Sequence, residues 1–381
     1  MRHEPKRTRV PRRPAPAVRA ALTASVLWLS ASAARADEVG SALYIRTDSD
    51  HTTVVSPRAR IKGDVAEGTS AEVAYGADIW TSASIDIRTA ASKVVMEQRD
   101  ELDLSLSHDL SDVTVGGGYR FSKENDYESH SGSGSVSYNF ADNAATLAAS
   151  AFVSGDTVGR SGDPKFKRAL TSFGGRLSFT QVLDPKTLVQ ASYEPAYFSG
   201  YQSSPYRYVG IGGDGRCHGV AQISSPMCVP EREPDTRLRH ALVGRVRRAF
   251  SNDVSAGLSY RFYLDSWGIS SHTIEAQLAW LTDEATELAL RYRFYTQGRT
   301  SFYKPVYQPT DNLKYVTIDR ELSAMGIQRV GIDLQHTFQV GSDVSLKGVT
   351  SAGVDLYHYN NFPGLKSVRA LELSFAGVLA L

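Results

Sequence analysis

The feature that most constrains the fold is a strict alternation of apolar and polar residues between Val254 and Leu281. This period of two is typical of a β-strand with one apolar and one polar face. Each arm of the segment is about ten residues long, which is enough to cross a bilayer when the strand is tilted. The apolar positions are Val254, Ala256, Leu258, Tyr260, Phe262 and Leu264 in the first arm and Ile274, Ala276, Leu278 and Trp280 in the second. We therefore interpret the segment as one hairpin of a transmembrane β-barrel.

The first 36 residues are organised like a secretory signal. A basic segment that ends at Arg19 precedes an apolar run from about Ala20 to Ala34, and Ala34-Arg35-Ala36 then has the A-x-A pattern of a cleavage site. An N-terminal membrane anchor is the weaker alternative, because a spanning helix needs roughly 18 apolar residues. We expect cleavage after Ala36, which leaves residues 37–381 as the barrel domain.

Removal of the signal segment changes the net charge. The whole chain has 42 Lys and Arg residues and 41 Asp and Glu residues, for a formal charge of +1. Residues 1–36 contain eight of the basic residues and one of the acidic residues, which leaves 34 basic and 40 acidic residues and a charge of −6. This balance argues against a nucleic-acid-binding protein.

Alternating segments recur along the rest of the chain, and short turns between them alternate with longer loops. The turns are predicted near residues 66–68, 108–112, 141–143, 184–185, 251–253, 282–284 and 341–343, and the longest loops near 199–235 and 296–328. We count about sixteen strands, which places both termini on one side. Periplasmic turns and longer extracellular loops are sorted in this way in bacterial barrels. A soluble β-sandwich is the alternative, with the aromatic residues in its core.

Five motifs extend this interpretation: Ser122-x-Glu124-x-Asp126-Tyr127, Pro205-Tyr206-Arg207-Tyr208-Val209, the segment from Tyr260 to Thr273, Tyr292-Arg-Phe-Tyr-x-Gln297, and Asp319-Arg320-Glu321-Leu322. Together they resemble an uncharacterised bacterial family of predicted outer-membrane β-barrels that is catalogued as a domain of unknown function. The last strand, with Leu371, Leu373, Phe375, Leu379 and Leu381 on one face, resembles the C-terminal insertion signal of outer-membrane proteins, although that signal usually ends in Phe. The family resemblance implies a barrel in the outer membrane and carries over no activity.

The charged residues of the polar faces should point into the lumen, because a lipid-facing Arg or Lys costs roughly 2–4 kcal/mol at mid-membrane. A charged constriction selects solutes by sign. In the alternative, ions on neighbouring strands, such as Arg58 and Arg60 near Glu72, pair and simply fill the barrel. The pore-lining candidates are Arg58, Arg60, Glu72, Arg176, Arg239, Arg245, Arg247, Arg261, Arg291 and Arg293. Basic residues are concentrated on the strands between about Leu238 and Phe294, so we predict a local preference for anionic solutes along that wall.

Cys217 and Cys228 are the only two cysteines, and both lie in the long loop predicted near 199–235. In a secreted protein we expect them to form a disulfide, which stabilises the loop by up to about 3 kcal/mol on loop-entropy arguments. A metal site is the alternative, although only His218 lies beside the cysteines and the C-x-x-C spacing is missing. We hypothesise that the cross-linked loop folds into the pore and narrows it.

A further set of polar residues is expected near the extracellular rim: Glu124, Asp126, Asp265, His272, Asp319 and Glu321. The carboxylates among them could bind a divalent cation through oxygen ligands, but we favour a role in holding the loops together. Ser271 and His272 are adjacent, and adjacent residues of a strand point to opposite faces. This argues against a hydrolytic Ser–His pair, so we expect no catalytic, metal-binding or cofactor-binding residues.

We therefore predict an all-β protein: one closed antiparallel transmembrane barrel of about sixteen strands. A barrel of this size leaves an aqueous lumen unless loops plug it. The function we favour is that of a porin-like channel for passive passage of small polar solutes, with outer-membrane lipid as its surroundings. Two alternatives are a plugged barrel that acts as a scaffold or partner of a cell-envelope complex, and an enzyme with its site at the extracellular rim.

Overall fold

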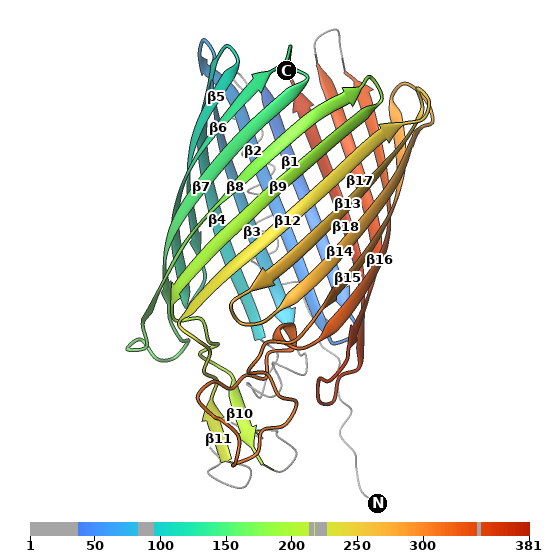
Figure 1. Ribbon diagram of the computed structural model, residues 1–381. Helices are drawn as coiled ribbons and strands as arrows, with labels where there is room; N and C mark the ends of the chain where they lie inside the picture. The colour runs from blue at the N-terminus through green and yellow to red at the C-terminus, as the bar shows by residue number, and fades with distance from the viewer. Residues whose placement is uncertain (1–36, 83–94, 213–216, 218–226, 341–343) are drawn as a thin grey trace, which may run out of the picture.

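The computed structural model describes residues 37–82, 95–212, 217, 227–340 and 344–381. These residues form a closed barrel of sixteen antiparallel strands, in which the first strand pairs with the last (Figure 1). The predicted fold class is confirmed, whereas the predicted signal segment lies outside the described residues. The barrel strands are β1 (Glu38–Asp48), β2 (Thr52–Ala66), β3 (Thr69–Ser82), β4 (Val95–Leu110), β5 (Val113–Lys123), β6 (Tyr127–Phe140), β7 (Ala145–Val158), β8 (Arg168–Asp184), β9 (Thr187–Gly200), β12 (Thr236–Ala249), β13 (Val254–Asp265), β14 (Ser270–Leu281), β15 (Thr286–Gln297), β16 (Met325–Gln339), β17 (Ser345–Tyr359) and β18 (Ser367–Ala380).

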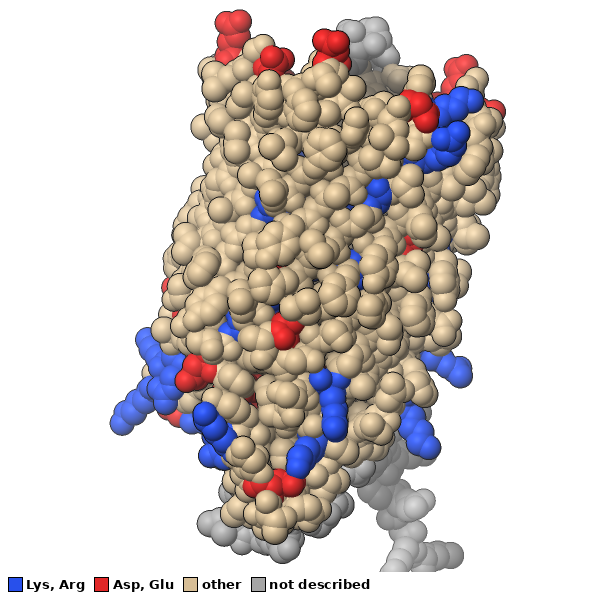
Figure 2. All heavy atoms as spheres, viewed as in Figure 1, with Lys and Arg blue, Asp and Glu red and all other residues tan. Residues whose placement is uncertain are grey.

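The outer surface of the barrel is an apolar belt made by alternate residues of each strand. Leu258 and Tyr260 of β13, and Ile274 and Leu278 of β14, are 51%, 44%, 42% and 44% exposed. On the face shown in Figure 2, most charged side chains lie toward the two ends of the barrel. An apolar surface this extensive is a liability in water and suits contact with lipid. The predicted outward faces of the strands are therefore confirmed.

The two ends of the barrel differ in their connections. Turns of two to four residues follow β2, β4, β6, β8, β12 and β14 at the end where Glu38 pairs with Ala380, which we take as the periplasmic end. The longest described loops, within 201–235 and 298–324, lie at the opposite, extracellular end. No helix of the described ranges has the length and apolar character needed to cross a membrane.

Several predicted boundaries were wrong. Three extracellular connections, after β1, β5 and β13, are as short as the periplasmic turns, so turn length does not alternate strictly. β4 continues to Leu110, into the turn predicted at 108–112, and β3 continues to Ser82. Both continue because ladder pairing persists beyond the apolar segment, as in the pair Ser82 and Val95. The turn predicted at 341–343 lies outside the described residues.

The two long extracellular loops pack against each other beyond the end of the barrel (Figure 1). The first contains a small sheet of β10 (Tyr208–Ile211) and β11 (Met227–Pro230), which the loop prediction for 199–235 did not include. Val209 and Ile211 pack on Tyr307 and Val316 of the second loop. We call the described residues of 201–235 and 298–324 the loop cap.

Candidate functional site

All ten predicted pore-lining residues lie at inward positions, which alternate with the exposed apolar positions of their strands. The charges are not spread evenly around the lumen. We call the inward faces of β1–β5 and β16–β18 the paired wall, and those of β8, β9 and β12–β15 the basic wall. The two walls differ in whether their arginines have acidic partners.

On the paired wall, every inward arginine contacts a carboxylate: these are Arg46, Arg58, Arg60, Arg99, Arg120 and Arg329. The predicted pair of Arg60 with Glu72 is confirmed at 3.1 Å, and Arg60 also reaches Glu38 at 2.9 Å. Each inward arginine of the paired wall therefore has a carboxylate partner on the same wall.

Arg58 does not pair with Glu72, although the ion-pair alternative expected it to. Its partners are Glu101 at 3.2 Å and Asp78 at 3.5 Å. The register sets Gly76 between Arg58 and Glu101, and a Cβ atom at Gly76 would lie 2.9 Å from an Arg58 guanidinium nitrogen. The guanidinium therefore crosses the glycine to reach the next strand.

The basic wall carries an excess of positive charge. Arg176 and Arg261 share Glu194, at 3.6 Å and 2.9 Å, and Arg291 pairs with Asp333 of β16. Within the described part of the chain, four further inward arginines have no carboxylate within ion-pairing distance: Arg239, Arg245, Arg247 and Arg293. Their charge faces the interior of the barrel.

The lumen is accessible to water. The inward side chains of Arg120, Arg58 and Arg291 are 58%, 47% and 46% exposed although they point into a closed barrel. On β5 and β6 the inward residues are short, and Gly116, Gly118, Ser133 and Ser135 line a groove of about 430 Å³. These side chains do not pack into a solid core.

A larger cavity of about 700 Å³ lies at the extracellular mouth, between the ends of β9 and β12–β15 and the residues Asp319, Glu321 and Leu322 of the loop cap. We call it the mouth cavity. Its lining combines arginines with aromatic and hydroxyl side chains, among them Arg237, Arg239, Arg261, Arg293, Phe198, Tyr201, Tyr263 and Trp267.

Asp265 fixes one edge of this cavity. Its carboxylate accepts hydrogen bonds from Arg237 Nε at 2.9 Å, from the Tyr263 hydroxyl at 2.7 Å and from the backbone N–H groups of Trp267 and Ile269 at 3.0 Å each. The guanidinium of Arg237 also lies 4.2 Å from the ring of Trp267. Asp265 thus holds the short loop between β13 and β14, and its oxygens are occupied by these donors.

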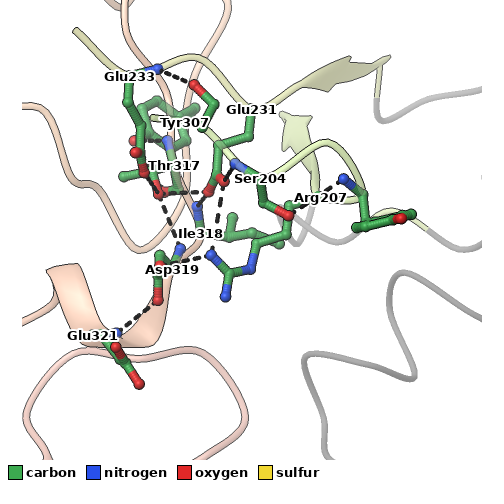
Figure 3. A network of polar contacts seen from close by, with 11 residues as sticks. Ser204, Arg207, Glu231, Glu233, Tyr307, Thr317, Ile318, Asp319 and Glu321 are labelled. Atoms are coloured by element: carbon green, nitrogen blue, oxygen red, sulfur yellow. Dashed lines mark hydrogen bonds and ion pairs between the residues drawn. The ribbon is translucent and has the colours of Figure 1, made fainter. Parts of the chain in front are cut away.

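A buried polar network joins the two loops of the cap (Figure 3). The Thr317 hydroxyl oxygen lies 2.6 Å from Glu231 and 3.3 Å from Glu233, and the Ser204 N–H donates to Glu231 at 3.0 Å. Arg207 pairs with Asp319 at 2.6 Å. Burial raises the pKa of Glu231, and burial followed by the charge of Glu231 raises the pKa of Glu233 to about 8. The network therefore favours the protonated form of these carboxyl groups.

The family described as "Protein of unknown function (DUF3570)" matches residues 91–172 and 160–367. The chain belongs to this family. No curated protein matches the sequence. Among solved structures, a bacterial polysaccharide outer membrane secretin is 7% identical, with a TM-score of 0.50, and the match covers 90% of this chain and 98% of that one. The CymD monoaromatic hydrocarbon channel is 9% identical (TM-score 0.43; 91% and 89% covered), and the siderophore receptor PirA from Pseudomonas aeruginosa is also 9% identical (0.41; 89% and 79%).

The secretin likeness supports the fold of this DUF3570 barrel. Closed barrels are the one form in which β-strands cross a membrane, because closure satisfies every backbone hydrogen bond. With its apolar belt, the protein is an outer-membrane barrel.

The other predicted rim residues lie at different places in the structure of the DUF3570 barrel. His272 points outward, and its Nδ1 lies 2.7 Å from the Tyr260 hydroxyl, so it belongs to the outer surface of the barrel. Ser271 is buried and faces the mouth cavity, as the alternation predicted. Glu124 and Asp126 lie in the connection between β5 and β6, where burial raises the pKa of both carboxyl groups.

The remaining rim residues, Asp319 and Glu321, belong to the loop cap. Asp319 accepts a hydrogen bond from the Glu321 N–H at 2.9 Å, and both residues line the mouth cavity. Among the described residues, no group of three or more His, Cys, Asp or Glu side chains is arranged to hold a metal ion. We favour a role for these carboxylates in holding the loops together. The contacts of Asp319 with Glu321 and Arg207 fit that role.

Cys217 and Cys228 form a disulfide with Cα atoms 5.8 Å apart. Cys228 belongs to β11, so the bond cross-links the loop cap, and this small sheet lies beyond the barrel end rather than between its walls (Figure 1). The hypothesis that the cross-linked segment folds into the pore is therefore wrong for β10 and β11. The cap residues that line the opening are Tyr201–Ser203, Glu233, Asp319, Glu321 and Leu322.

Sequence reasoning did not identify Glu231, Glu233 or Thr317. A signal was present, because Pro230-Glu-Arg-Glu-Pro234 places two carboxylates two residues apart between prolines. Their partner, Thr317, lies more than 80 residues away in sequence, and no local pattern indicated that contact.

Proposed function

We propose that this DUF3570 protein is a channel for the passive passage of small polar solutes across the outer membrane. The observation that carries the proposal is the water-accessible lumen: inward arginines of both walls stay about half exposed within a closed barrel. A plugged barrel would bury these side chains against its plug. Charged groups that line an aqueous path act on permeating ions.

We further propose that the basic wall favours anions. Arg245 and Arg247 face the lumen from β12 without a carboxylate partner among the described residues, and they border a groove of about 310 Å³. The six arginines of the opposite wall are already neutralised by acidic partners. An anion on the axis therefore meets uncompensated positive charge on one side only.

Planar bilayers with a salt gradient test both parts of the proposal. The purified barrel should conduct, and the sign of its reversal potential in KCl should indicate a preference for chloride. The double substitution Arg245→Gln and Arg247→Gln should move the reversal potential toward zero. Arg248→Gln is the matched control, because Arg248 lies on the same strand but points outward at the periplasmic edge, near Asp184.

Two outcomes would contradict the proposal at different levels. An absence of single-channel steps from folded, heat-modifiable protein would contradict the channel itself and favour the alternative of a scaffold or partner in the cell envelope. A clear preference for potassium in a conducting barrel would contradict only the anion preference. The adjacent Ser271 and His272 offer no support for an enzyme, since one faces the mouth cavity and the other the outer surface.

A further inference from the structure

We propose that the mouth cavity is a binding site for hydroxylated organic carboxylates of the sugar-acid class, which occupy it before they enter the lumen. This inference rests on the proposed channel function and adds the class of solute to it. Three properties of the cavity carry the inference: unpaired arginines, hydroxyl and amide groups beside ring faces, and acidic residues that limit the charge of the ligand.

Arg239 and Arg293 supply the positive charge. Both line the mouth cavity, and neither has a carboxylate within ion-pairing distance among the described residues. Arg239 Nε is buried and has no hydrogen-bond partner, while the guanidinium lies 4.2 Å from the ring of Phe198. A buried guanidinium N–H without an acceptor is costly. For the guanidinium as a whole a carboxylate is the best-matched partner, because the planar fork of arginine fits two carboxylate oxygens.

Hydroxyl and amide groups form the second property. Tyr201, Gln202 and Thr273 line the cavity beside Tyr263 and Trp267. The amide nitrogen of Gln202 is occupied by the Pro234 carbonyl at 3.2 Å, so its amide oxygen can accept a hydrogen bond from a ligand hydroxyl. The rings of Tyr201 and Tyr263 are only partly buried and offer faces on which the C–H surface of a sugar ring can lie, whereas Trp267 is 3% exposed and is covered by Arg237. A purely apolar carboxylate would leave the hydroxyl and amide groups without partners.

The third property is the acidic side of the cavity. Glu233, Asp319 and Glu321 of the loop cap are among its lining residues. Asp319 is bonded to Arg207 and to the Glu321 N–H, and the negative charge on this side of the cavity repels a second negative charge on the ligand. A monoanionic sugar acid is therefore favoured over a phosphate ester. The volume of about 700 Å³ lies within the usual range of small-ligand sites and admits a mono- or disaccharide.

Binding and conduction can be measured separately. Isothermal titration of the detergent-purified protein with D-glucuronate should show saturable binding, whereas D-glucose, benzoate and inorganic phosphate should bind at least about tenfold more weakly, because each lacks one of the matching features. In bilayers, glucuronate added on the extracellular side should interrupt the chloride current.

Substitutions locate the site. Arg239→Gln should weaken glucuronate binding about tenfold or more, and Arg239→Lys, which keeps the charge but loses the fork, should have an intermediate effect. Lys165→Gln is the matched control, because it removes one positive charge from an exposed extracellular loop outside the cavity. Heat-modifiable gel mobility shows that each variant is folded.

Each outcome is decisive. Equal binding of glucuronate and glucose, tighter binding of phosphate or benzoate, or unchanged binding in folded Arg239→Gln would overturn the inference, even in a barrel that conducts chloride. Specific binding of glucuronate by a barrel that shows no conductance would support the site while contradicting the channel on which its role in uptake rests. The two failures are therefore distinguishable.

Discussion

Replacing Glu233 by glutamine is expected to stabilise the loop cap at pH 9 and to leave its stability nearly unchanged at pH 5. Glutamine has the shape of a protonated glutamate, and its amide can donate to the Thr317 oxygen, which lies 3.3 Å from Glu233. The one proton of the Thr317 hydroxyl is directed to Glu231 at 2.6 Å. A neutral donor at position 233 therefore completes the contact, whereas an ionised carboxylate places two acceptors face to face.

The size of the effect follows from the pKa of Glu233. Burial, followed by the charge of Glu231, raises this pKa from 4.5 to about 8. The packed cap binds the proton of Glu233 more tightly than separated loops do. The contribution of Glu233 to the stability of the cap is therefore fully present below pH 4.5 and is lost as the pH rises through about 8. At about 1.4 kcal/mol for each pKa unit, the upper bound at pH 9 is about 5 kcal/mol. Water that enters the loosened cap makes the real effect smaller than this bound. We expect the variant and the wild type to differ in cap stability by about 2 kcal/mol at pH 9, or roughly 30-fold in the opening equilibrium.

Amide hydrogen exchange of the cap, read by mass spectrometry, measures that equilibrium. Wild type and Glu233→Gln are compared at the same pH, so the intrinsic exchange rates cancel in their ratio. We expect a ratio near one at pH 5 and slower exchange of the variant in residues 227–235 and 313–318 at pH 9. The barrel strands serve as the internal control. Equal ratios at the two pH values, or faster exchange of the variant at pH 9, would refute the reasoning.

Three further predictions concern the barrel, the cross-link and the N-terminus. Leu258→Arg, on the lipid face of β13, should lower the unfolding free energy in lipid vesicles by roughly 2–4 kcal/mol, whereas Ser259→Arg on the lumen face should cost less; similar losses for both would contradict the assigned faces. Without reduction, Cys217 and Cys228 should resist a thiol reagent, and their joint replacement by serine should lower the stability of the cap by up to about 3 kcal/mol; labelling of the unreduced protein would exclude the disulfide. N-terminal sequencing of the protein from the membrane should begin directly after Ala36, and a sequence that begins elsewhere would contradict the predicted cleavage.

The barrel was predictable because its determinant is local. A strand with one face in lipid must alternate apolar and polar residues. The outward orientation of Leu258 and Tyr260 can therefore be predicted without knowing which strands pair. The same rule placed Arg245 and Arg247 in the lumen and separated Ser271 from His272. It could not fix where strands end, because pairing at Ser82 and Leu110 continues after the apolar pattern has stopped.

The loop cap was not predictable by the same rule, because its contacts join segments that are distant in sequence. Arg207 meets Asp319 across 112 residues, and Thr317 meets Glu231 across 86. Loop residues have no lipid face to impose a period, so the sequence there shows composition but not orientation. The cysteines were an exception, because two cysteines in a secreted chain are expected to form a disulfide with each other.

The ion pairs of the lumen were predictable only in part, because they depend on the register between strands. Arg60 and Glu72 flank one tight turn, so their proximity follows from the hairpin alone. The partner of Arg58 depends instead on a second register, between β3 and β4, and on the missing side chain of Gly76 that lets the guanidinium cross to Glu101. Because the inward arginines of the paired wall find such partners and Arg239, Arg245, Arg247 and Arg293 do not, the lumen acquires an uneven charge that the nearly balanced composition does not indicate. We expect that difference in pairing, more than the net charge of the chain, to decide which solutes enter.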